Sequence, residues 1–289
     1  MSREIFDAHC DTLLKKETGK SFITGGGSMH VDLPSLLESG VGDQVMAVCI
    51  KPYTGREREM WDIALNNYQQ LRYTQMPRLH FALEGCLALS KGWELPFHPL
   101  VASLTWNGDN PYAGGIGSQM DLTDLGRKLV KQFTRENTAI DVSHLNDRSR
   151  KSLLQLGLPV CATHCNARAL CNGHNRNLPD EDIVEIARNG GVIGTTFVPE
   201  FLEDSGSDAT IESVINHMEY VAELTSIDSV GFGSDFDGVG KLPRGISGAG
   251  SWHKVLYGLE NRGWSNKDID KAAGGNWRRF FKLDKEFSG

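Results

Sequence analysis

Apolar residues in this chain gather in short runs that are separated by longer segments of mixed polarity. Runs rich in Val, Ile, Phe and Ala that are bounded by polar or turn-forming residues are typical of buried strands. Such runs predict strands at residues 4–9, 45–50, 78–84, 99–105, 138–143, 158–163, 191–197 and 229–234. The strand pattern therefore extends along most of the chain.

Amphipathic segments lie between several of these runs. Apolar positions recur at helical spacing in residues 211–222 and again in residues 121–135. Residues 178–191 carry a proline and acidic residues at their start and glycines at their end, which are start and stop signals of a helix. Strands that alternate with helices predict a (β/α)8 TIM barrel, formed as a single domain by residues 1–289. A doubly wound open sheet is the alternative, but no G-x-G-x-x-G fingerprint follows the first predicted strand.

The composition is that of an ordinary globular protein, with 39% hydrophobic and 23% charged residues. A net charge of −7 argues against general affinity for nucleic acid or for an anionic membrane. The first predicted strand leaves no room for the apolar core of a signal peptide, and no apolar run reaches membrane-spanning length. The six cysteines lack the spacing of a disulfide scaffold, which favours a cytoplasmic protein with reduced thiols. A homodimer is compatible with the sequence.

Histidines and acidic residues stand at the carboxyl ends of five of the predicted strands. These residues are His9, Asp11, Glu84, His144, His164 and Asp235. Barrel enzymes carry their active sites at the carboxyl ends of the strands, so these side chains are expected to converge. Imidazoles and carboxylates together suit zinc or a similar divalent cation. The sequence therefore predicts a metal site at this end of the barrel.

Each of these residues also has a plainer interpretation. His9 and Asp11 alone would be a polar strand end, and Glu84 alone would be a surface glutamate before a glycine. A single histidine after a strand is more often hydrogen-bonded than a metal ligand. It is the joint placement at strand ends that favours the metal site, because chance would scatter such residues over both barrel ends and the helices. His217, by contrast, is expected on the polar face of the predicted 211–222 helix.

The chain contains, in order, the segments DAHCDT at 7–12, ALEG at 82–85, SLTWNGDNPYAGG at 103–115, DVSHLN at 141–146, ATHCNAR at 162–168, RNLPDE at 176–181, GFGSDFDGV at 231–239 and GGNWRRFF at 274–281. These segments resemble the renal (membrane) dipeptidases, metallopeptidases of the amidohydrolase superfamily. No single segment is specific, but their ordered combination along nearly the whole chain is.

The resemblance implies a barrel of the metal-dependent hydrolase type with two divalent metal ions, expected to be Zn²⁺. His9 and Asp11 would bind one ion, His144 and His164 the other, and Glu84 would bridge both. The implied activity is hydrolysis of dipeptides, including those with a C-terminal D-residue, by a hydroxide that bridges the metals.

Three further residues have roles that the resemblance implies. Asp235 would be the catalytic aspartate, and Arg176 would bind the free carboxylate of the dipeptide. Trp106 occupies a position where well-studied relatives have a histidine that contacts the scissile carbonyl region. Trp106 offers only an indole N–H and an apolar face. The alternatives are therefore a related binuclear hydrolase for a lactone, cyclic amide or phosphoester, and a descendant that only binds.

Overall fold

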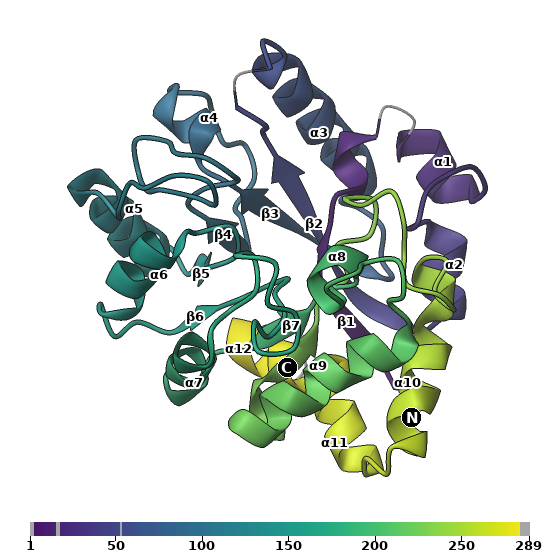
Figure 1. Cartoon of the computed structure of the whole chain (residues 1–289). Helices are drawn as coiled ribbons and strands as arrows, with labels where there is room; N and C mark the ends of the chain where they lie inside the picture. The colour runs from purple at the N-terminus through teal and green to yellow at the C-terminus, as the bar shows by residue number, and fades with distance from the viewer. Residues whose placement is uncertain (1–2, 16–17, 53, 284–289) are drawn as a thin grey trace.

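Eight parallel strands form a nearly closed barrel with helices around it (Figure 1). The structure is a computed structural model that describes residues 3–15, 18–52 and 54–283. The strands are β1 (Ile5–Cys10), β2 (Val41–Cys49), β3 (Arg78–Glu84), β4 (Val101–Ser103), β5 (Ala139–Asp141), β6 (Val160–Cys161), β7 (Ile193–Thr195) and β8 (Val230–Phe232). Each lies within or overlaps a strand predicted from the sequence, so the expected barrel is confirmed.

The sheet is paired in the order β6-β5-β4-β3-β2-β1-β8-β7. Between β6 and β7 the barrel is closed by a parallel bridge from Ala162 to Ile193. The amide of Ala162 donates to the carbonyl of Val192 at 3.0 Å, and the amide of Gly194 donates to the carbonyl of Ala162 at 2.8 Å. This closure excludes the open doubly wound sheet.

Strands β5 and β6 are shorter than the apolar runs predicted. The carboxylate of Asp141, the last residue of β5, accepts hydrogen bonds from the amides of Ser143 and Thr163, each at 2.9 Å. These two amides therefore donate their hydrogen bonds to a side chain and not to the backbone of a neighbouring strand. Asp141 therefore ends the regular pairing of both strands and begins the loops that carry His144 and His164.

The helices follow the strands around the outside of the barrel. They are α1 (Thr18–Thr24), α2 (Leu33–Glu38), α3 (Glu57–Leu71), α4 (Leu87–Ser90), α5 (Asp124–Arg135), α6 (Asp147–Leu154), α7 (Asp180–Arg188), α8 (Pro199–Leu202), α9 (Ile211–Leu224), α10 (Trp252–Asn261), α11 (Asn266–Asp270) and α12 (Asn276–Phe281). The three helices predicted from the sequence are α5 and α9, from their periodicity, and α7, from its start and stop signals. Helix α5 begins at Asp124 because the Thr123 side chain caps it, accepting from the amide of Gly126.

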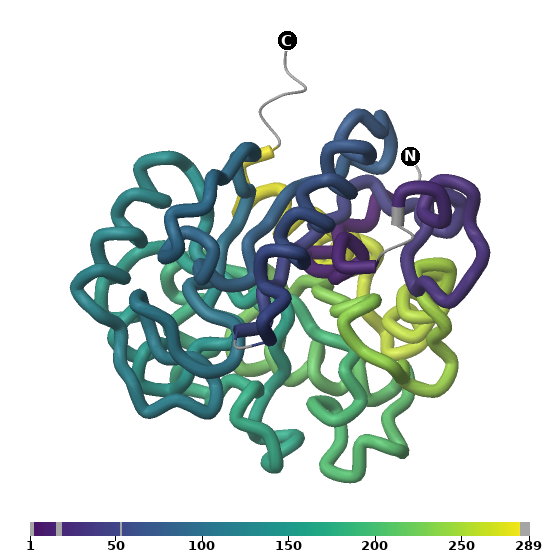
Figure 2. The backbone as a smooth tube through the Cα atoms, turned by 90° about the horizontal axis from the view of Figure 1, so that it is seen from above, coloured from purple at the N-terminus to yellow at the C-terminus, as the bar shows by residue number. Residues whose placement is uncertain are grey.

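Figure 2 shows early and late segments of the chain side by side. The amide of Ala249 donates to the carbonyl of His30 at 2.8 Å, which joins the segment after α1 to the segment before α10. Across the described residues, every helix is too short or too polar to cross a membrane.

Part of the barrel interior is filled by apolar side chains and by Trp277 of α12. This group contains Phe6, Ala8, Val45, Ala47, Ala82, Val101, Cys161, Val192 and Trp277. Its members come from strands on opposite sides of the barrel, β2 and β6 among them, so the group lies inside the barrel. The Trp277 indole N–H donates to the carbonyl of Phe232 at 3.0 Å, and a Cβ at Gly231 would collide with the indole ring. At the amino-terminal end of the strands the buried carboxylate of Asp43 contacts Arg78, His80 and Arg278, so polar side chains stand at both ends of the barrel.

His217 does not lie on a polar face of α9. Its side chain is 1% exposed, its Nδ1 accepts from the amide of Ala167 at 3.1 Å, and its Nε2 faces the carbonyl of Leu202 at 3.1 Å. The expectation from the helix pattern is wrong because the loop after β6 and helix α8 cover this position. The imidazole is a buried link from α9 to that loop and to α8.

Candidate metal centre

The structure brings together the six residues that the sequence predicts at the strand ends. His9 belongs to β1, Glu84 ends β3, and the other four stand in the loops after β1, β5, β6 and β8. The three histidines and Glu84 are buried, whereas Asp11 and Asp235 are partly buried. The convergence expected from the barrel is therefore present.

His9, Asp11 and Asp235 form one side of the cluster. His9 Nε2 lies 3.7 Å from Asp11 Oδ1 and 3.8 Å from Asp235 Oδ1. Backbone hydrogen bonds fix this approach, since the amide of Asp235 donates to the carbonyl of His9 at 3.1 Å. The amide of Asp11 donates in turn to the carbonyl of Phe236 at 2.9 Å. The end of β1 is thus tied directly to the loop that carries Asp235.

Glu84 stands between this side and the other two histidines. Its Oε2 is 3.7 Å from His9 Nε2, and its Oε1 is 2.5 Å from His144 Nε2 and 3.6 Å from His164 Nε2. The Nε2 atoms of His144 and His164 are 3.1 Å apart. The two oxygens of one carboxylate therefore face different imidazoles, which is the arrangement that a bridging ligand requires.

The outer nitrogens of two histidines are held by side chains. His144 Nδ1 lies 2.9 Å from Asn107 Oδ1, and His164 Nδ1 lies 2.8 Å from Thr163 Oγ1. Thr163 Oγ1 donates its own proton to Asp141 Oδ2 at 2.6 Å, so it accepts from His164. Metal-binding histidines usually donate their second N–H in this way, which leaves Nε2 as a lone-pair donor. Both Nε2 atoms point into the cluster.

The backbone at this end of the barrel is locally strained. His144, Asp235 and Asp237 have φ angles of 68°, 61° and 66°, which non-glycine residues seldom adopt. Asp237 is anchored by a hydrogen bond from Thr12 Oγ1 at 2.7 Å and another from the amide of His30 at 2.9 Å. Strain of this kind is concentrated at functional sites, where surrounding contacts hold it in place.

Burial dominates the electrostatics of the cluster. It raises the pKa of Glu84 to about 7 and raises the pKa values of Asp11 and Asp235 well above their ordinary range. It also lowers the pKa values of the three histidines, which are neutral in this setting. The mutual repulsion of the carboxylates adds to the shift at Asp11 and Asp235. Cations bound among these groups would relieve both burial and repulsion.

The residues present fit divalent metal ions. Among the described residues, His9 Nε2, Asp11 Oδ1 and Glu84 Oε2 are buried and have no hydrogen-bond partner. Two groups have ligand atoms within 4.8 Å of one another, His9 with Glu84 and His164, and His9 with Asp11 and Asp235. Buried polar atoms without partners are costly, and ligation would satisfy all three.

Arg176 lies in the loop after β6, close to the cluster. The residue is only 7% exposed, its Nη1 donates to Cys165 Sγ at 3.7 Å, and its guanidinium lies 5.5 Å from the centre of the Phe201 ring. Its charge partly offsets the rise that burial produces in the pKa values of Glu84 and Asp235. Within the described parts of the chain Arg176 pairs with no carboxylate. A buried cation without an anionic partner is available to an anionic ligand.

Trp106 lies beside the cluster but does not belong to it. Its ring centre is 6.0 Å from that of His144, and Lys51 places its Nζ 5.4 Å from the centre of the indole. Lys51 follows β2, and its charge partly offsets the rise that burial produces in the pKa of Asp11. No pattern in the sequence selects Lys51, since an exposed lysine after a strand is common. Asp141 and Thr163 were also missed, although both stand beside predicted ligands.

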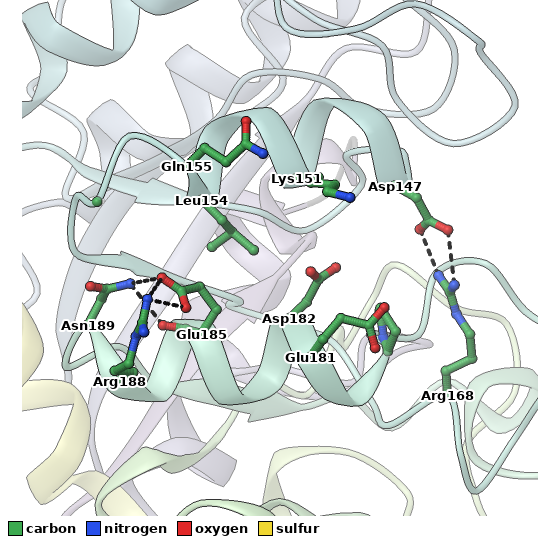
Figure 3. Close-up of a pocket in the computed structure, with 12 residues that line it drawn as sticks. Asp147, Lys151, Leu154, Gln155, Arg168, Glu181, Asp182, Glu185, Arg188 and Asn189 are labelled. Carbon is green, nitrogen blue, oxygen red and sulfur yellow. Dashed lines mark hydrogen bonds and ion pairs between the residues drawn. The ribbon is translucent and has the colours of Figure 1, made fainter.

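A groove of about 560 Å³ lies between α6 and α7, away from the cluster (Figure 3). Several of its charged side chains are paired, since Arg168 contacts Asp147 at 2.8 Å and Arg188 contacts Glu185 at 2.6 Å. The groove therefore lacks the group of buried, unpartnered ligand atoms that the cluster has.

Comparison with known proteins identifies similar sequences. The family model for membrane dipeptidase (peptidase family M19) matches residues 97–287. An uncharacterized dipeptidase of Schizosaccharomyces pombe is 28% identical over 191 residues, which are 64% of this chain and 46% of that protein. An uncharacterized Klebsiella pneumoniae protein from the pqqA 5′ region is 32% identical over 61% of this chain and 69% of its own length. The match thus spans about half the length of the S. pombe relative.

Solved structures share the fold at low sequence identity. A metallopeptidase from Rhodobacter sphaeroides, liganded with a phosphinate mimic of L-Ala-D-Ala, has a TM-score of 0.83 and 22% identity, with 96% of this chain and 98% of that chain covered. The probable dipeptidase PvdM from Pseudomonas aeruginosa has a TM-score of 0.83 and 16% identity, with 97% and 95% covered. At these identities the likeness shows a shared barrel.

Proposed function

Because this chain belongs to the membrane dipeptidase family (peptidase family M19), we propose that it is a metal-dependent dipeptidase. The observation that carries the proposal is the position of Glu84, whose two carboxylate oxygens face imidazoles on both sides of the cluster. The R. sphaeroides metallopeptidase, which shares the fold, binds a dipeptide mimic with a C-terminal D-residue. The proposed substrates are therefore dipeptides, including those that end in a D-residue. The proposal takes residues 1–289 as one barrel domain.

The proposed ligands divide into two sets. His9 and Asp11 would hold one divalent ion, His144 and His164 would hold another, and Glu84 would contact both. This donor set of imidazoles and carboxylates suits Zn²⁺. Bound ions of this kind supply Lewis acidity, which polarises a carbonyl group and lowers the pKa of water from 15.7 toward about 7.

Asp235 is the proposed proton carrier. Its Oδ1 lies 3.8 Å from His9 Nε2, at the edge of the cluster, and burial raises its pKa well above the ordinary range of a carboxyl. A carboxylate with a raised pKa is a stronger base than an exposed one, so it can accept the proton of the attacking water. The protonated carboxyl can then donate to the amine that leaves when the peptide bond breaks.

Arg176 is the proposed anchor for the substrate carboxylate. Its guanidinium is buried and, among the described residues, has no ion pair with a carboxylate. A planar guanidinium can bind a carboxylate through two parallel hydrogen bonds, which fixes orientation as well as position. A free carboxylate one residue beyond the scissile bond is present in dipeptides, so this contact would select them over longer peptides.

Trp106 supports a second candidate on the same centre. An indole beside His144 offers an apolar face to the substrate, which would also suit a lactone, a cyclic amide or a phosphoester. In either case the metal ligands and Asp235 would act in the same way.

The test combines metal analysis with a substrate panel. Protein purified without chelator should carry about two divalent ions per chain and hydrolyse L,L- or L,D-dipeptides. Lactones and phosphodiesters in the same panel identify the second candidate. A protein that is active without metal would overturn the proposal, and so would a metal-loaded protein that cleaves no dipeptide.

A further inference from the structure

A second cation stands at the mouth of the metal centre. Lys51 follows β2, its side chain is exposed, and its Nζ lies 5.4 Å from the centre of the Trp106 indole. Among the described residues Lys51 has no carboxylate partner, and its charge only partly offsets the rise that burial produces in the pKa values of Asp11 and Cys49. The ammonium group is therefore held near the cluster without being neutralised.

The order of the strands places Lys51 and Arg176 on opposite walls of the barrel. Lys51 follows β2 and Arg176 follows β6, and in this barrel three strands separate β2 from β6 in either direction. Side chains that follow these two strands face each other across the carboxyl-terminal mouth. The metal ligands lie between them. The mouth thus offers two separate cations, one buried and one exposed.

We propose that Lys51, positioned by Trp106, binds the side-chain carboxylate of an acidic N-terminal residue in the substrate. The inference rests on the proposed function, in which Arg176 binds the C-terminal carboxylate. With that end fixed beside β6 and the scissile bond at the cluster, the N-terminal residue extends toward the β2 wall. Aspartyl and glutamyl dipeptides carry an anion at each end of this path, and each anion meets one of the two cations.

The contact with Trp106 explains how an exposed lysine can favour substrates with an acidic N-terminal residue. A free lysine side chain loses rotamer freedom when it binds, which cancels much of the gain from an exposed ion pair. A cation held against an indole face has already lost part of that freedom. The indole therefore acts as a platform that keeps the ammonium group at the mouth.

The experiment compares Glu-Ala with Gln-Ala, which have nearly the same size and differ in charge. The metal-loaded wild-type protein should favour Glu-Ala in kcat/KM by roughly two- to fivefold, the factor that an exposed ion pair produces. The difference should appear in KM, because the contact is remote from the reacting bond. It should shrink in 1 M salt, where screening is strong.

Variants test whether Lys51 and Trp106 cause the preference for Glu-Ala. Lys51→Met should bring the ratio close to one, and Lys51→Glu should reverse it. Trp106→Phe keeps an aromatic face and should retain the preference, whereas Trp106→Leu should lose it. Lys131→Met, which removes an exposed lysine from α5, is the matched control and should keep the wild-type ratio.

The outcomes separate this inference from the proposed function. Equal hydrolysis of both peptides by the wild type, or a preference that survives Lys51→Met, would overturn the role of Lys51 and leave the dipeptidase proposal standing. Hydrolysis of neither these peptides nor any other dipeptide would overturn both.

Discussion

Gly238, in the loop after β8, is the point at which a single methyl group should disable the metal centre. A Cβ at this position would lie 2.7 Å from Asp11 Oδ2 and closer still to Asp235 Oδ1. Ordinary van der Waals contact begins at 3.4 Å, so Asp11 Oδ2 must move by about 0.7 Å and Asp235 Oδ1 by more. Gly238 is not among the residues with positive φ, so alanine does not strain its backbone. The damage should therefore fall on the two carboxylates.

A displacement of about 1 Å in a catalytic group costs on the order of 10²-fold in rate, or about 2.7 kcal/mol. Gly238→Ala should lower kcat/KM for a dipeptide by about that factor, and it should also lower metal content. Gly240→Ala is the matched control in the same loop, because a Cβ there would meet nothing within 4 Å. Steady-state kinetics and elemental analysis of both variants provide the measurement. If both keep the wild-type rate and metal content, the close approach of Gly238 to Asp11 and Asp235 has no functional meaning.

Three further predictions follow from other contacts. Asp235→Asn should keep most of the bound metal and lower turnover by about 10²- to 10⁴-fold, as the loss of a proton carrier does; unchanged turnover would remove Asp235 from the reaction. Arg176→Ala should raise KM for free dipeptides and leave that for C-terminally amidated dipeptides unchanged; an equal response of both would contradict the carboxylate role. Burial lowers the pKa of His217 from 6.5 to about 4, so stability is fully present above pH 6.5 and is lost as the pH falls toward 4. At about 1.4 kcal/mol per unit this loss is about 3 kcal/mol, so urea unfolding at pH 7 and pH 4.5 should show a fall in stability that is larger by about that amount in the wild type than in His217→Gln.

The barrel and most of the cluster were predictable because they depend on local patterns. Apolar runs mark buried strands whatever their partners are, and a parallel barrel then gathers all carboxyl ends on one side. His9, Glu84 and His164 could be placed together without any knowledge of their contacts. The strand ends were less predictable, because the Asp141 carboxylate takes two amides that the apolar runs assigned to the sheet.

Contacts between distant loops could not be read from the pattern. His217 was expected on a polar face, but its partners Ala167 in the loop after β6 and Leu202 in α8 meet α9 only in the folded chain. Lys51 and Trp106 are likewise 55 positions apart in sequence and meet only because their loops share the mouth. Helical or strand periodicity reports which side of an element is covered, and it contains no information on single polar contacts of this kind.

The weak closure between β6 and β7 has a consequence for how the metal centre is built. Its β1 and β3 side rests on long strands whose backbones are paired with β2 over several residues. The side that carries His144 and His164 follows strands of three and two residues, next to the single bridge at Ala162. There the geometry depends on side chains, those of Asp141, Thr163 and Asn107. The geometry of the β1 and β3 side is therefore set by the backbone of the fold. The geometry of the side that carries His144 and His164 is set by three side chains, which substitution can change without disturbing the barrel.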